Sequence, residues 1–211
     1  MSTAKDLFII AMEERPGSGV GQGDLSLALA GAELLDLLAV QAASLDGDLI
    51  VPGGQDAPHD ELVAEALSAL IRQVPYERVE EWLWRRGREL SAAYQAALEE
   101  AGQLTRGRRA LLPFGNDRLE VAESPTRRRA RSRWEGGEPN LIALAAAVGI
   151  SASRSEDGSD HVNESVFLEG EENEAVMTVL ASVNDAVMEL EAVRQRRSIE
   201  NAAFANVWRV P

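Results

Sequence analysis

The chain has 211 residues and a mass of 22.8 kDa, which is long enough for one domain with a real core. Its 21 basic and 35 acidic side chains give a net charge of −14, so a nucleic-acid partner is not expected. It contains no cysteine and two histidines, which excludes disulfides, thiolate catalysis and a three-histidine metal site within one chain. We therefore expect no cofactor and no metal.

The apolar stretches of the chain do not predict a membrane span. The short apolar run Leu7–Met12 is followed at once by acidic residues and does not resemble a signal peptide. The longest stretch, Leu25–Val40, contains Glu33 and Asp36 and is too short to cross a bilayer. Together with the missing cysteines, this pattern predicts a cytoplasmic location, with any membrane contact peripheral.

Hydrophobic spacing predicts helices over most of the chain. In chain order, the expected helices are Leu25–Val40, Asp60–Val74, Glu77–Ala101, Thr126–Trp134, Asn140–Val148 and Glu171–Arg197. Asp24 is the expected N-cap of the first, and Pro75 is expected to end the second. Gly87 is expected to bend or split the third. The last carries a continuous apolar seam, formed by Val176, Leu180, Val183, Val187 and Leu190.

Two segments depart from helical periodicity. Between Gly102 and Ala122 the pattern predicts two short strands around a turn, and the Ser-, Asp- and Gly-rich segment 151–170 predicts a mobile loop. The expected fold is mainly α, with a helical bundle core, surrounding amphipathic helices and one or two small β-hairpins, in a single domain over residues 1–211.

No motif for catalysis is found in the sequence. The glycine run Gly17–Gly23 lacks the spacing of a dinucleotide-binding turn, and neither His59 nor His161 accompanies a nucleophile motif. Three adjacent acidic pairs point apart on a helix and are interpreted as solvated: Glu13 with Glu14, Glu80 with Glu81, and Glu99 with Glu100. We therefore expect no catalytic residue and no enzymatic activity.

Two tryptophans stand beside a group of arginines. Trp82 and Trp84 lie two apart on a helix, so one is expected in the core and the other on a contact surface. The arginines that follow, Arg85, Arg86 and Arg88, could bind phosphate or sugar beside the exposed ring; a charged helix surface is the alternative.

The main electrostatic feature is an arginine-rich segment, residues 106–133, where nine arginines face three acidic residues. The candidate lipid- or anion-binding residues are Arg106, Arg108, Arg109, Arg127, Arg128, Arg129 and Arg131. An apolar tip for membrane insertion or self-association stands between them and consists of Leu111, Leu112 and Phe114. The alternative is that the tip packs inward and the arginines pair with acidic residues from 134–191.

The order of elements resembles the Golgi phosphoprotein 3 family over residues 5–150. The stretches that carry the resemblance are Leu7–Met12 with the polar turn Glu13–Gly17, the buried Leu25–Leu37 followed by Leu49–Val51, the turn and helix start Asp56–Leu67, and Leu98–Leu104 followed by Ala110–Phe114. The resemblance implies a mainly helical fold and a peripheral membrane adaptor. It also implies binding of phosphatidylinositol 4-phosphate, and a hairpin used in self-assembly and membrane contact.

The chain departs from the family at its lipid site. The family's tryptophan before the buried helix is missing near Gly21, an arginine is replaced by Ala30, and no arginine stands at Leu90–Ala93. The expected function is a non-enzymatic adaptor that binds a phosphoinositide or another anionic phospholipid head group. The alternative is a protein-interaction or self-association scaffold without lipid. The expected partners are an anionic membrane surface and a protein partner or second copy.

Overall fold

The computed structural model describes residues 2–14, 20–54, 60–107, 118–151 and 171–207. The predicted loop at 152–170, the apolar tip Leu111, Leu112 and Phe114, the arginines Arg108 and Arg109, and both histidines lie outside the described residues.

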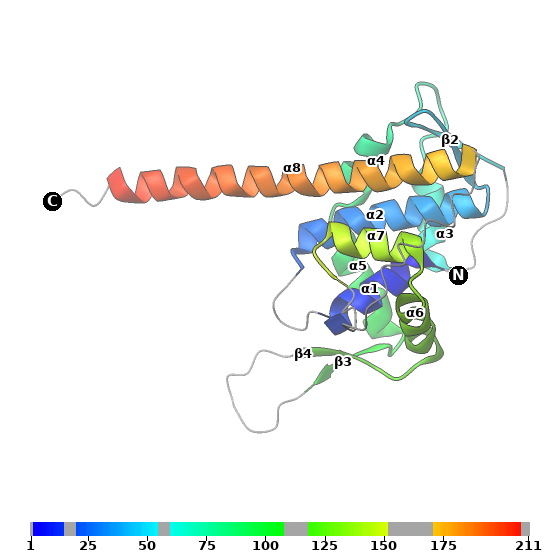
Figure 1. The fold of residues 1–211 in the computed structure, drawn as a ribbon, viewed down its shortest axis with the longest axis horizontal. Coiled ribbons are helices and arrows are strands. Elements are labelled where there is room, and N and C mark those ends of the chain that lie inside the picture. Colours follow the sequence, from blue (N-terminus) through cyan, green and yellow to red (C-terminus); the bar gives the residue numbers. More distant parts are fainter. Residues whose placement is uncertain (1, 15–19, 55–59, 108–117, 152–170, 208–211) are drawn as a thin grey trace, which may run out of the picture.

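The described ranges form eight helices and two antiparallel two-stranded sheets, which confirms a mainly α fold (Figure 1). The helices are α1 (Thr3–Glu14), α2 (Gln22–Ala39), α3 (Glu61–Ala69), α4 (Val79–Arg86), α5 (Leu90–Glu100), α6 (Pro125–Glu135), α7 (Pro139–Ala147) and α8 (Glu171–Val207). The strands are β1 (Ala43–Asp46) paired with β2 (Leu49–Pro52), and β3 (Leu104–Gly107) paired with β4 (Arg118–Val121).

Helix α2 is the centre of the fold. Every residue from Leu25 to Leu37 is buried, because apolar side chains occupy all faces of this helix. It contacts α1, α3, α4, α5, α7 and α8, and Figure 1 shows α7 and α8 running alongside it. The predicted burial of this segment is therefore confirmed.

One buried carboxylate of α2 caps another helix. Asp36 accepts hydrogen bonds from the Thr3 N–H at 2.7 and 2.9 Å and from the Ala4 N–H at 3.3 Å. These amides belong to the first turn of α1 and have no partner within that helix. Burial raises the pKa of Asp36 above its usual value, against the opposing effect of these bonds.

Several helix ends differ from the predicted ones. Asp24 is not the N-cap of α2; the helix begins at Gln22 after Gly21, and Asp24 lies in the first turn. Asp60 does cap α3, accepting from the Leu62 N–H at 3.2 Å. That helix ends at Ala69 rather than Val74, because the backbone of the next residue, Leu70, is already extended.

The predicted break at Gly87 is confirmed, since α4 ends at Arg86 and α5 begins at Leu90. A Cβ at Gly87 would lie 2.5 Å from the Leu83 carbonyl oxygen and 3.3 Å from that of Ser26. The glycine therefore allows the turn to approach the backbone of α2, where a side chain would collide.

The seam of α8 is used inside the molecule. Val183 of the seam is buried, and its other members are partly buried against the core: Val176, Leu180, Val187 and Leu190. Val179 and Ala186 are buried beside them, and α8 contacts α2, α4 and α7. From Gln195 onward every described side chain is exposed, and Figure 1 shows this end of the helix projecting well beyond the body.

The closest approach between α2 and α8 depends on Gly31. A Cβ built there would lie 2.3 Å from Cγ2 of Val183, so Gly31→Ala forces the helices apart. We expect this substitution to lower the free energy of unfolding by about 1–2 kcal/mol, although alanine favours a helix more than glycine does. Urea denaturation measures the change. When Gly31→Ala is combined with Val183→Ala, the loss of stability should be smaller than the sum of the losses in the two single variants. If Gly31→Ala alone is as stable as wild type, the proposed contact is contradicted.

Candidate functional site

The arginines of α6 face the acidic side chains of α1. Arg129 and Arg133 both reach Asp6, with N–O distances of 2.6 Å. Arg127 and Arg131 both reach Glu13, the second at 3.1 Å. Arginines four apart on one helix therefore share one carboxylate of the other helix. The two groups form successive links along the α1–α6 contact.

The acidic partners are buried and the arginines are not. The side chain of Asp6 is 0% exposed and that of Glu13 is 9% exposed, whereas Arg131 is 53% exposed. The prediction that Glu13 lies on a solvated face was therefore wrong. Its ion pair with Arg127 also raises the pKa of that guanidinium above the usual value.

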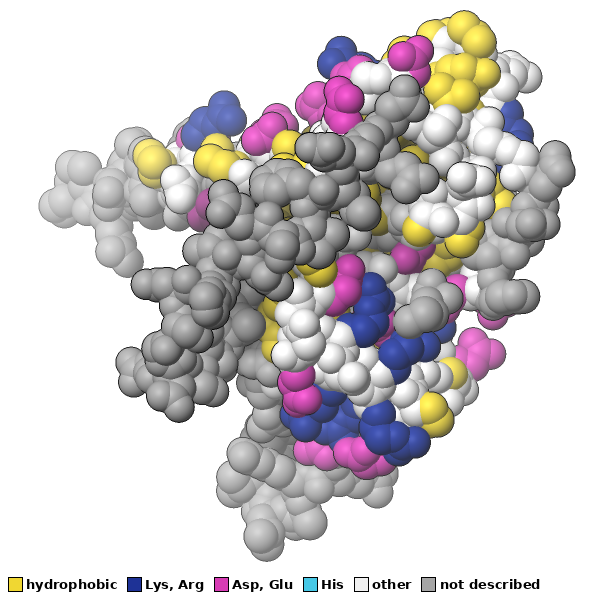
Figure 2. Space-filling model, turned by 45° about the vertical axis from the view of Figure 1, so that its right-hand side comes forward, with side chains coloured by type: hydrophobic (Ala, Val, Ile, Leu, Met, Phe, Trp, Pro, Cys, Tyr) yellow, Lys and Arg dark blue, Asp and Glu magenta, His cyan; other side chains and the backbone are white. Residues whose placement is uncertain are grey.

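This arrangement resembles the internally paired alternative, but with different acidic partners. Most of the carboxylates come from α1 and from Glu123, which pairs with Arg127. Within the described part of segment 134–191, Glu138 is the residue that pairs with an arginine of α6, Arg133, at 3.2 Å. Arg128 is exposed and forms no ion pair with any described residue. Figure 2 shows basic and acidic side chains interleaved over the lower part of the molecule, where Figure 1 places α6.

With Glu123 and Glu138 included, four carboxylates meet the four paired arginines of α6, so Arg128 is the exposed cation left over among the described side chains. Whether the predicted residues Arg127, Arg128, Arg129 and Arg131 bind an anion stays a prediction. Arg106 lies in β3, but its side chain is outside the described ones.

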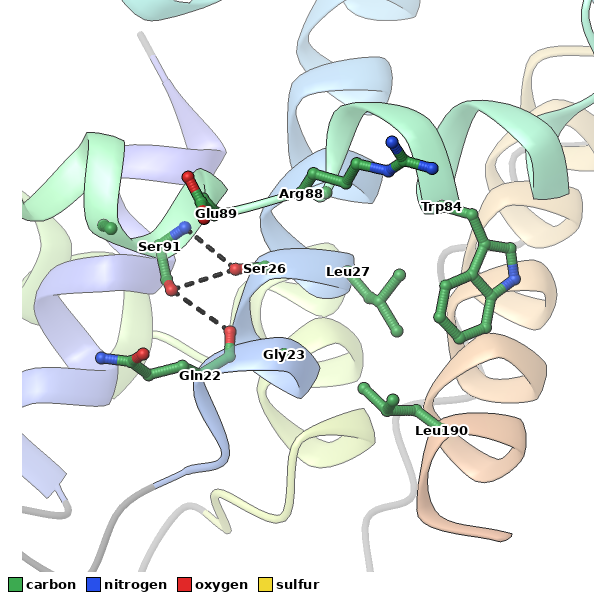
Figure 3. A pocket seen from close by; sticks show the side chains of 11 residues that line it. Gln22, Gly23, Ser26, Leu27, Trp84, Arg88, Glu89, Ser91 and Leu190 are labelled. Carbon is green, nitrogen blue, oxygen red and sulfur yellow. Dashed lines mark hydrogen bonds between the residues drawn. The ribbon is translucent and has the colours of Figure 1, made fainter. Parts of the chain in front are cut away.

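A second feature is an open cleft of about 440 Å³ at the start of α2. It lies between that helix end, the turn joining α4 to α5, and α8 (Figure 3). Its lining residues are Gln22, Gly23, Ser26, Leu27, Trp84, Gly87, Arg88, Glu89, Ser91, Ala92 and Leu190. One side is apolar, formed by Leu27, Trp84 and Leu190, and the other is polar.

The polar side is held by hydrogen bonds between α2 and α5. The Ser91 N–H donates to Oγ of Ser26 at 3.0 Å, and Oγ of Ser26 donates to Oγ of Ser91 at 3.0 Å. The Ser91 hydroxyl in turn donates to the Gln22 carbonyl at 3.2 Å. Both serines are buried, so this chain of bonds fixes the two helix starts relative to each other.

The N-terminus of α2 opens toward the cleft, and the free amides of a first helical turn carry partial positive charge. The first-turn amides of α5 already donate, those of Leu90 and Ala92 to the Gly87 and Glu89 carbonyls and that of Ser91 to Ser26. The negative charge of Asp24 is paired with Arg194, at 2.7 and 2.8 Å. Glu89 is the carboxylate among the lining residues, and Figure 3 shows it at the Ser91 end, away from Trp84.

Arg88 differs from the other arginines nearby. Arg85 binds Glu77 with two bonds of 2.6 Å, and Arg86 binds Glu33 at 2.7 and 2.9 Å. Arg88 is exposed and forms no ion pair with any described side chain. In Figure 3 its side chain extends above Leu27 toward Trp84. The expectation of one core and one contact tryptophan agrees with these positions, since Trp82 is fully buried.

The arginine-rich segment gives a stronger signal in the sequence than any residue of this cleft. Trp84 and Arg88 gave a weak signal, and the glycine run marked the start of α2. No local pattern, however, indicates that segments near residues 22, 88 and 190 converge. Such convergence depends on how the helices pack and is not encoded in spacing along one helix.

A buried network supports the turn that carries Arg88. Glu33 is fully buried, where it accepts from Arg86 and from the Tyr94 hydroxyl at 3.1 Å. It thereby joins α2 to both α4 and α5. Burial raises the pKa of Glu33 above its usual 4.5, and it raises that of Tyr94 well above 10.

The raised pKa of Glu33 makes stability depend on pH. Above pH 4.5 the folded protein retains a proton that the unfolded chain has released, so the contribution of Glu33 to the free energy of unfolding falls as pH rises through the folded-state pKa. In Glu33→Gln this dependence is absent. Urea denaturation at a series of pH values from about 4 to about 7 should show the stability of wild type relative to the variant declining. A difference that is constant with pH would contradict the assignment.

Two substitutions distinguish the ion-paired arginines of α6 from Arg128, which has no ion pair among the described residues. Asp6→Asn removes the charge-assisted hydrogen bonds of Arg129 and Arg133 to a buried carboxylate, and we expect it to lower the free energy of unfolding by about 2 kcal/mol. Arg128→Ala removes no ion pair and should change stability by less than about 0.5 kcal/mol. Urea denaturation at neutral pH compares the two. Equal effects would show that the α1–α6 links are not structural.

Comparison with protein-family models identifies the family of this chain. A search of curated protein sequences gives no match. Within the described residues, no helix has the length and apolar character needed to cross a membrane, and no group of three acidic or histidine side chains is arranged to hold a metal ion. A scan against protein-family models matches residues 4–190 to Golgi phosphoprotein 3 (GPP34), which is most of the chain. The chain therefore belongs to the Golgi phosphoprotein 3 family, which is not a known enzyme family.

Proposed function

We propose that this protein is a peripheral membrane adaptor that binds an anionic phospholipid head group in the cleft at the start of α2. Membership of the Golgi phosphoprotein 3 family supports the adaptor role. The observation that carries the proposal is that the N-terminus of α2 and Arg88, which has no ion pair among the described residues, meet in one open cleft.

The polar side of the cleft suits a phosphate group. First-turn amides of α2 offer donors to a phosphate, and the dipoles of α2 and α5 both favour an anion at this place. Arg88 adds a guanidinium, whose planar fork matches two phosphate oxygens. Since Asp24 is neutralised by Arg194, the carboxylate nearest the start of α2 does not oppose an anion there.

The apolar side suits the region beneath a head group. Trp84 is half-buried and lies beside Leu27 and Leu190, so its ring offers an amphipathic surface at the mouth of the cleft. Tryptophan is enriched at the membrane–water interface for this reason.

The arginines of α6 take a supporting part in this proposal. Four of them are engaged with Asp6 and Glu13, so the exposed Arg128 and the outer part of Arg131 are the groups free to meet a negative membrane. The rest of the molecule is acidic and repels such a surface, which makes binding sensitive to salt.

Vesicle sedimentation tests the proposal. Wild-type protein should bind phosphatidylcholine vesicles containing phosphatidylinositol 4-phosphate and should not bind phosphatidylcholine alone. Arg88→Ala should weaken binding about fivefold, corresponding to about 1 kcal/mol for one arginine at an anionic surface. Arg72→Ala is the matched control, because Arg72 is exposed and outside the cleft. Equal, negligible binding to both vesicles would refute lipid binding.

A second pair of variants separates the cleft from α6. Ala92→Glu places a carboxylate on an exposed lining position in the first turn of α5, where it favours the helix but repels an anion. It should abolish binding while leaving the far-UV circular dichroism unchanged. Arg128→Glu should reduce binding less. If Arg128→Glu weakens binding more than Ala92→Glu does, the lipid site lies on α6 rather than in the cleft.

A further inference from the structure

The outer face of α8 carries a second line of regularly spaced side chains. Its members recur every three or four residues, and all are exposed: Met177, Ala181, Asn184, Met188, Ala192, Gln195 and Ile199. We call this line the outer stripe. Its largest apolar members, Met177, Met188 and Ile199, are 59%, 64% and 69% exposed. Such spacing is typical of a helix that packs against another helix along its length.

The outer stripe is separate from the seam that joins α8 to the body. The buried side chains Val179, Val183 and Ala186 fall between the stripe positions, on the face turned to the core. No described residue covers the stripe, so burying the seam leaves it available.

The projecting end of α8 has the right length to cover the stripe of another copy. This overhang, Gln195–Val207, is about 20 Å long, and so is the body-bound part of the stripe from Met177 to Glu189. A free helix of this size is marginal in water and gains stability from a partner. If two copies pair antiparallel, each overhang lies along the body-bound stripe of the other.

Charges beside the stripe favour the same arrangement. Asp185 and Glu189 lie on one flank in the body-bound part, and Arg196 lies on that flank in the overhang. In an antiparallel pair the same flank of each helix faces the other, and the two helices run in opposite directions. Arg196 of each copy then lies within about one helical turn of Asp185 and Glu189 of the second copy. Glu200, which follows Arg196 on the same flank, falls near Asp185 in this pairing, so the complementarity rests on Arg196 with Glu189, once at each end.

From these observations we propose that the outer stripe binds the outer stripe of a second copy, forming an antiparallel helix pair with its twofold axis near Ala192. The family match ends at residue 190, so the overhang lies outside the matched region. The inference goes beyond the proposed lipid binding and does not rest on it.

Because the chain contains no cysteine, single cysteines can map the pairing directly. Ala192→Cys should form a disulfide-linked dimer under mild oxidation, since the two positions meet near the axis. Ile199→Cys alone should not, because its two copies lie about 20 Å apart along the pair. A mixture of Met188→Cys and Ile199→Cys chains should cross-link. If both Ala192→Cys and Ile199→Cys cross-link to themselves, the helices are parallel and the proposal is wrong.

Light scattering over a concentration series tests the association without cysteines. Wild type should be dimeric, and Met188→Glu with Ile199→Glu should weaken the dimer at least about tenfold. Val74→Glu is the control, because Val74 is 80% exposed and does not belong to α8. Arg196→Glu should also weaken the dimer, and Arg196→Glu combined with Glu189→Arg should restore it. A wild-type chain that is monomeric at every concentration, or a dimer unaffected by the stripe variants, would overturn the proposal.

Discussion

The burial of α2 on every side is the constraint on which the structure depends. A helix that is apolar all round must be surrounded, and six other helices contact it. Its two buried carboxylates then decide where some of these neighbours lie, because an unpaired charge in the core is costly. Glu33 requires the α4–α5 unit with Arg86 and Tyr94, and Asp36 requires the first turn of α1. The cleft forms where the first turn of α2 leaves this enclosure.

The helices themselves could be predicted because their signal is local. The apolar residues of Leu25–Val40 predicted a buried helix, and Gly87 predicted a break that its close approach to Ser26 explains. Helix ends were less accurate, since they depend on interactions outside the helix. Asp24 has the chemistry of an N-cap, but Arg194 holds its carboxylate, and the two residues are 170 apart in sequence. Nothing near Asp24 indicates that partner.

The arginines of α6 show how a run of like charges can be mainly structural. Arginines four apart on α6 meet carboxylates two turns apart on α1, so two buried acids and four bases bind the helices together. The spacing of the arginines and the spacing of Asp6 and Glu13 are both present in the sequence. Their match could not be found without knowing that α1 and α6 are neighbours, and the acidic composition of 134–191 suggested other partners. Of the sequence candidates with described side chains, Arg128 is the one left without a partner among the described residues.

Leu190 forms part of the cleft wall, Arg194 holds the first turn of α2, and both belong to the same continuous helix that carries the outer stripe. If the proposed ligand shifts Leu190 and the proposed second copy holds the far end of α8, both events act on one helix. Thermodynamic reciprocity then requires the ligand to change the affinity of pairing by the same factor as pairing changes the affinity for the ligand.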